Sequence, residues 1–91
     1  MSIAKDLIFT FTDGVKAREE DFGLLVVSKS TPALSLNKDC KFVWELIDGK
    51  RTVSDILDKL NEEYEGDNIE ELLYQILESL QKLNLIKAVN S

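Results

Sequence analysis

The chain has few side chains that could perform catalysis or bind a metal ion. It contains no histidine and a single cysteine, Cys40. Histidines and clustered cysteines are the usual ligands of zinc and iron–sulfur centres, and a thiolate nucleophile needs an electropositive, partly exposed position. Cys40 instead falls on the apolar stripe of an expected helix, where free cysteine packs as a small hydrophobic residue. We therefore expect no enzyme activity, no metal ion and no cofactor.

Two other features could belong to a site. Trp44 could stack on a ligand, but it shares the apolar stripe of Cys40, which favours an anchor in the core. Six acidic residues gather where the second expected helix gives way to the third, with a spacing that matches neither a calcium loop nor a catalytic carboxylate pair. We expect them to be solvated surface: Glu62, Glu63, Glu65, Asp67, Glu70 and Glu71.

Length and charge narrow the class of protein. The 91 residues suit one small domain. The chain carries 17 acidic and 11 basic residues, a formal charge of −6, so its field repels nucleic acids and anionic membranes. No segment has the pattern of a signal peptide or a membrane-spanning helix, and one cysteine cannot form an internal disulfide. We expect a cytoplasmic protein that binds neither nucleic acid nor membranes.

The elements that position these residues begin with short strands. Alternation and β-branched residues predict strands at residues 15–19 and 22–28, after the Asp13-Gly14 turn. The run Ile8 to Thr12 also alternates, but chain ends are often loose. We therefore divide the chain into an N-terminal extension of unassigned structure and role, residues 1–13, and a domain over residues 14–91.

A further strand is expected at residues 33–36, after Pro32. Its period of two directs Leu34 and Leu36 to the core and Ala33 and Ser35 to the other face. Strands that pair in chain order leave this last strand with one free edge, and no charge protects it. Such an edge accepts an extended peptide, or it pairs with a second copy of the chain in a homodimer.

Three helices follow. Asn37 is expected to cap the first, whose buried stripe ends at Ile47 before Gly49, and Thr52 with Asp55 forms a capping box for the second. The third begins at Asp67 or Asn68, ends at a left-handed Asn84, and precedes a short strand or tail at residues 85–89. Its apolar side chains span an arc of about 160°, wider than the roughly 100° of a helix lying on a core: Ile69, Leu72, Leu73, Ile76, Leu77, Leu80 and Leu83.

This order of elements is a winged helix-turn-helix pattern. One function for such a fold is DNA-binding transcriptional regulation. In such a regulator the third helix would read DNA. Glu70 and Glu71 lie close to its start, and their negative charges disfavour contact with phosphates. The alternative is a peptide-binding protein that uses the free strand and the wide apolar helix.

From Val15 onward the sequence resembles the PqqD family of RiPP precursor-peptide recognition elements. The resemblance is carried by Leu36-Asn37 before a helix, by LIDGKRTV at residues 46–53, and by Ile76-Leu77-x-x-Leu80 followed by Leu85-Ile86. It implies an α+β winged helix-turn-helix with an N-terminal three-stranded antiparallel sheet and three helices. It also implies a non-catalytic chaperone that binds the leader of a ribosomally synthesised precursor peptide by β-strand addition and presents it to a modifying enzyme.

The resemblance places the leader along the strand at residues 33–36, beside the third helix. Leu72 and Leu83 stand where the family often has an acid and a polar residue. We therefore expect apolar side chains to hold the leader at these positions, in place of a salt bridge to the family acid. The implied partner enzyme is a radical SAM enzyme or a leader peptidase. The predicted leader-binding residues are Ala33, Leu34, Ser35, Leu36, Leu72, Gln75, Ile76, Ser79 and Leu83.

Overall fold

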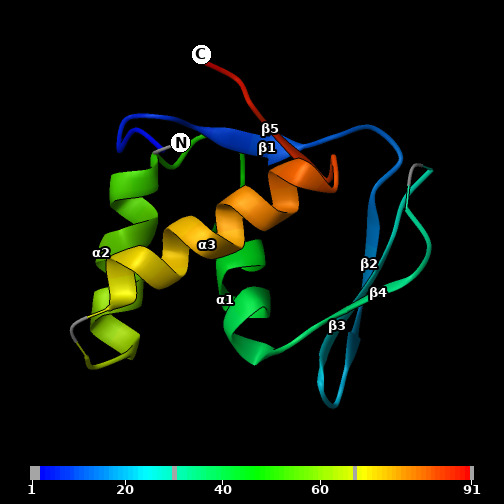
Figure 1. Cartoon of the computed structure of the whole chain (residues 1–91), viewed down its shortest axis with the longest axis horizontal. Helices are drawn as coiled ribbons and strands as arrows, with labels where there is room; N and C mark the ends of the chain where they lie inside the picture. Colours follow the sequence, from blue (N-terminus) through cyan, green and yellow to red (C-terminus); the bar gives the residue numbers. More distant parts are fainter. Residues whose placement is uncertain (1–2, 30, 67, 91) are drawn as a thin grey trace.

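The computed structural model describes residues 3–29, 31–66 and 68–90, which form a mixed α+β fold with three helices and antiparallel sheets (Figure 1). The predicted α+β class is confirmed. No helix within these ranges is long and apolar enough to cross a membrane. The elements in chain order are β1 (Phe9–Phe11), β2 (Lys16–Glu20), β3 (Gly23–Val27), β4 (Leu34–Leu36), α1 (Lys38–Leu46), α2 (Val53–Glu63), α3 (Ile69–Lys82) and β5 (Ile86–Ala88).

One sheet has the order β2-β3-β4, with antiparallel pairing throughout. The register pairs Leu24 with Leu36 and Val26 with Leu34. Because side chains alternate along a strand, these residues share one face of the sheet. Leu24, Val26 and Leu36 are buried there against the helices, and the predicted inward direction of Leu36 is confirmed.

The second sheet joins the two ends of the chain. β1 pairs antiparallel with β5, with Phe9 opposite Ala88. The sequence assigned residues 1–13 no structure, yet Phe9 and Ile3 are buried and belong to the main core. The predicted strand or tail at residues 85–89 is therefore a strand, and its partner is a segment more than 70 residues earlier.

The local signals at the helix ends are confirmed. The Asn37 side-chain oxygen accepts a hydrogen bond from the Cys40 N–H at 2.9 Å, and Thr52 and Asp55 exchange the two hydrogen bonds of a capping box, each 3.1 Å long. Asn84 has the expected positive φ, 61°. α3 begins at Ile69 with Asn68 at its N-cap, whereas Asp67, the other predicted start, lies outside the described residues.

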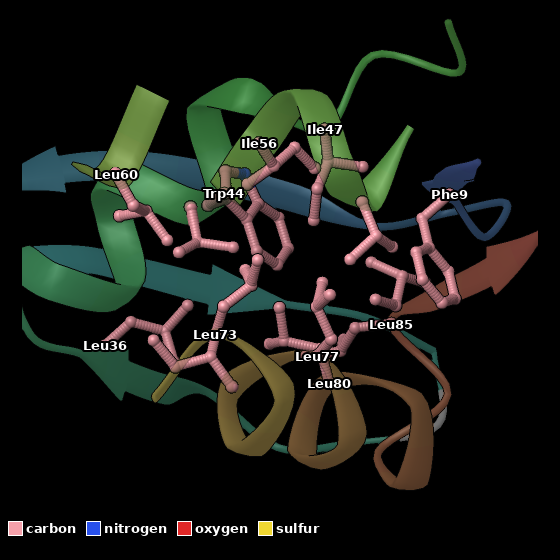
Figure 2. Close-up of a cluster of buried hydrophobic side chains, with 14 of the residues drawn as sticks. Phe9, Leu36, Trp44, Ile47, Ile56, Leu60, Leu73, Leu77, Leu80 and Leu85 are labelled. Atoms are coloured by element: carbon pink, nitrogen blue, oxygen red, sulfur yellow. The ribbon is translucent and has the colours of Figure 1, made fainter. Parts of the chain in front are cut away.

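The core lies where α3 crosses the other two helices (Figure 2). Leu73, Leu77 and Leu80 project from α3 into the same cluster as Trp44 of α1 and the inner residues of α2. Trp44 is 7% exposed, so its predicted role as a core anchor is confirmed.

Candidate functional site

β4 is an edge strand. Within the described residues it pairs only with β3, on one side. Gly23, at the start of β3, has a φ of +145°, and a Cβ there would clash with the Leu36 carbonyl oxygen. Only glycine permits this close approach of the two backbones. The inner edge of β4 is thereby held against β3, and its outer edge presents N–H and C=O groups on alternate residues.

A groove of about 360 Å³ lies between this edge and α3. The β4 side of the groove contributes Leu34 and Leu36, and the other wall comes from successive turns of α3. The lining residues are Leu34, Leu36, Cys40, Leu72, Gln75, Ile76, Ser79, Leu80 and Leu83. The structure thus brings every predicted site residue to this groove except Ala33 and Ser35.

The side chains of Ala33 and Ser35 lie outside the groove. Both residues are exposed, and Ser35 pairs with Leu25 on the opposite face of the sheet. Since residues of a strand alternate between faces, Ser35 can contribute only its backbone to the groove edge. Ala33 precedes the first residue of β4.

Two lining residues were not predicted as site residues. Leu80 and Cys40 were both assigned to the core; Leu80 is indeed buried, but it also backs the groove. Cys40 is half-buried in the first turn of α1, four residues after Leu36. This short spacing in the sequence could have predicted that Cys40 lies beside the end of β4. Burial, and then the charge of Asp39, raise the pKa of the Cys40 thiol above its ordinary value, which disfavours the nucleophilic thiolate.

The lining is mostly aliphatic, with Gln75 and Ser79 as exposed polar side chains on the α3 wall. No group of three histidine, cysteine, aspartate or glutamate residues that could hold a metal ion occurs in the described part of the chain. An aliphatic groove beside an open strand edge can bury apolar side chains of an extended segment while the edge bonds its backbone.

A second hollow, of about 350 Å³, lies on the other side of α1, where Lys38, Lys41 and Glu45 line it together with Glu20 and Asp21 of the β2–β3 hairpin. Lys41 binds Glu19 with an Nζ–Oε1 distance of 2.8 Å. That hydrogen bond lowers the pKa of Glu19 and raises the pKa of Lys41. Charges of both signs line this hollow beside the rings of Phe42 and Tyr64, so it is more polar than the groove beside β4.

The same fold occurs in two solved structures of leader-peptide complexes. TbiB1 in complex with the TbiA(beta) leader peptide superposes with a TM-score of 0.76, at 20% sequence identity over 85% of this chain and 93% of that chain. Lasso peptide synthetase B1 complexed with the leader peptide also gives a TM-score of 0.76, at 17% identity over 87% of this chain and 96% of that chain. These similarities establish a shared fold.

No curated protein sequence matches the chain. The model of the family described as coenzyme PQQ synthesis protein D (PqqD) matches residues 24–86, well over half of the sequence. The match spans β3, β4, all three helices and the start of β5, and so includes both walls of the groove. The predicted resemblance is confirmed, and the chain belongs to the PqqD family.

Proposed function

We propose that this protein binds the leader of a ribosomally synthesised precursor peptide as an added strand on β4. The observation that carries the proposal is the open edge of β4 beside an aliphatic groove whose other wall is α3. Two proteins of the same fold are described in complex with leader peptides, which supports the same role here.

Backbone and side chains have separate tasks in this mechanism. The outer N–H and C=O groups of β4 bind the leader backbone independently of its sequence, and Leu34, Leu36 and the α3 leucines select apolar side chains. A bound strand has a second edge, which faces α3. The unpaired backbone N–H and C=O groups on this second edge recur every two residues, about 6.7 Å apart. Gln75 and Ser79 are one turn apart on α3, about 6 Å, so they can hydrogen-bond successive groups on that edge.

The protein performs no chemistry in this proposal. It presents the bound precursor to a modifying enzyme, for which a radical SAM enzyme and a leader peptidase are the two candidates. Holding the leader raises the local concentration of the rest of the precursor at the active site.

We also propose that α1, α2 and α3 with the β1–β5 pair form a winged helix-turn-helix, and that β2, β3 and β4 are its N-terminal sheet. The peptide-recognition domain, predicted over residues 14–91, would then also include β1. The burial of Phe9 and the pairing of β1 with β5 support this extension.

The test is isothermal titration calorimetry with synthetic leader peptides from small open reading frames beside the gene, and with a DNA duplex as control. Binding of one leader with a micromolar or lower Kd, and none of the duplex, is expected. Binding of DNA alone would contradict the proposal and favour a transcriptional regulator. Sedimentation of the protein with and without leader separates peptide capture from a homodimer that occupies the β4 edge with a second copy.

A further inference from the structure

The dimensions of the groove limit the segment that can occupy it. Leu72 and Leu83 mark its extent along α3, a span of about 16 Å at 1.5 Å per helical residue. An extended chain rises about 3.3 Å per residue, so about five residues cover this length. Because alternate side chains point the same way, about three of these five would face the aliphatic lining.

The groove continues into a charged hollow at one end. A space of about 320 Å³ is lined by Asn68, Glu71, Leu72 and Gln75, and it shares Leu72 and Gln75 with the groove. Glu71 is exposed at this end, near the start of α3. Its neighbour Glu70 lies 3.5 Å from Lys5 in an ion pair, whereas no ion pair involves Glu71 within the described ranges.

We propose that the groove selects a leader segment with apolar side chains on alternate residues and a lysine or arginine next to them, paired with Glu71. This inference rests on the proposed function and adds the chemical class of the ligand. An extended chain lying on the aliphatic lining passes directly into the hollow that Glu71 lines. A cation there meets a carboxylate that is otherwise available, beside the apolar surface of Leu72.

The direction of the strand sets the order of these residues. In Figure 2, Leu36 lies toward the end of α3 that carries Leu73, so β4 runs toward the Glu71 end. A segment that pairs antiparallel to β4, as the strands of this sheet pair with one another, begins at the Glu71 end of the groove. The cationic residue then precedes the apolar residues in the leader sequence.

The first experiment is a selection of random nonapeptides, displayed on bacteria, against the full chain. Enrichment of alternating apolar residues preceded by lysine or arginine is expected. Enrichment of the apolar pattern without a basic preference overturns this inference and leaves the proposed function intact. No enrichment of extended apolar segments overturns the proposed function and this inference together.

The second experiment is a charge exchange with one selected peptide. Glu71→Gln should raise its Kd about threefold to fivefold, the size expected of an exposed ion pair. The control is Glu62→Gln, which makes an equal change of net charge at an exposed position of α2. This variant should leave the Kd unchanged. Glu71→Lys should prefer a peptide whose basic residue is replaced by glutamate. Equal effects of the Glu71 and Glu62 variants would show that only the net negative charge of the protein attracts the peptide. That result would overturn the ion pair between the peptide and Glu71.

Discussion

The ring of Phe11 stacks on the indole of Trp44, with 4.5 Å between the ring centroids and 34° between the ring planes. Phe11 belongs to β1 and Trp44 to the buried face of α1. This contact, with the pairing of β1 and β5, fastens the N-terminal segment to the helices that support the groove. The N-terminal strand is thus structural, although it lies outside the region matched by the family model.

Phe11→Ala should lower the free energy of unfolding by about 2 kcal/mol, because it removes a large, half-buried ring and an aromatic pair. Urea denaturation followed by the fluorescence of Trp44, the sole tryptophan, measures the change. Phe22→Ala is the matched control, since Phe22 is 47% exposed and its loss should change stability by less than about 0.5 kcal/mol. Equal effects of the two substitutions would show that the β1–α1 contact adds no stability.

Leu72 and Leu73 are neighbours on α3 with different predicted roles. Leu73 is fully buried, so Leu73→Glu should prevent folding, because an unpaired charge in a core is strongly destabilising. Leu72 is half-buried on the groove wall, so Leu72→Glu should leave the circular dichroism spectrum unchanged and raise the leader Kd at least about tenfold. Unfolding of the Leu72 variant would place Leu72 in the core and move the edge of the groove elsewhere.

The Leu36 carbonyl faces Gly23 of β3, so the backbone groups of its neighbour Ser35 face the open edge. Ser35→Pro removes this outward donor of β4 and should abolish leader binding. Circular dichroism must accompany the titration, because proline can also disturb the pairing with β3. Methylating single backbone nitrogens of the leader avoids that problem. Binding should be lost for methylation at every second residue of the bound segment, where the N–H faces β4. It should be weakened less at the residues between them, where the N–H faces Gln75 and Ser79. Uniform tolerance of methylation would contradict strand addition on β4.

Cys40 reports on occupancy of the groove and on pH. Because its pKa is raised, a smaller fraction of the thiol is ionised at pH 8 than in an unperturbed cysteine, and alkylation by iodoacetamide should be slower. The rate should rise with pH and reach its plateau above the pKa of an ordinary thiol, as measured for a short cysteine peptide in the same buffers. Saturating leader should slow the reaction further. An unchanged rate with leader bound would show that the leader does not cover Cys40.

The sequence alone determined the features that depend on neighbouring residues. The cap at Asn37, the capping box at Thr52 and the left-handed Asn84 are satisfied by bonds and dihedral angles within a few residues, so their residue types predict them. The 3.6-residue period of α3 placed its apolar residues in one wide arc, within which the family comparison singled out Leu72 and Leu83. Together with the family resemblance, this was enough to name seven of the nine lining residues.

Only the tertiary structure decided which distant segments meet. The pairing of β1 with β5, and the seating of Phe11 on Trp44, join residues far apart in the chain. Neither contact can be predicted from the residues next to it in the sequence. The free energy of each contact comes from burying apolar surface, and either segment could bury that surface elsewhere. Cys40 also appeared to be a core residue until the fold set α1 beside the end of β4. Short-range hydrogen bonds are determined by residues that are close together in the sequence, whereas long-range burial depends on how all the elements pack at once.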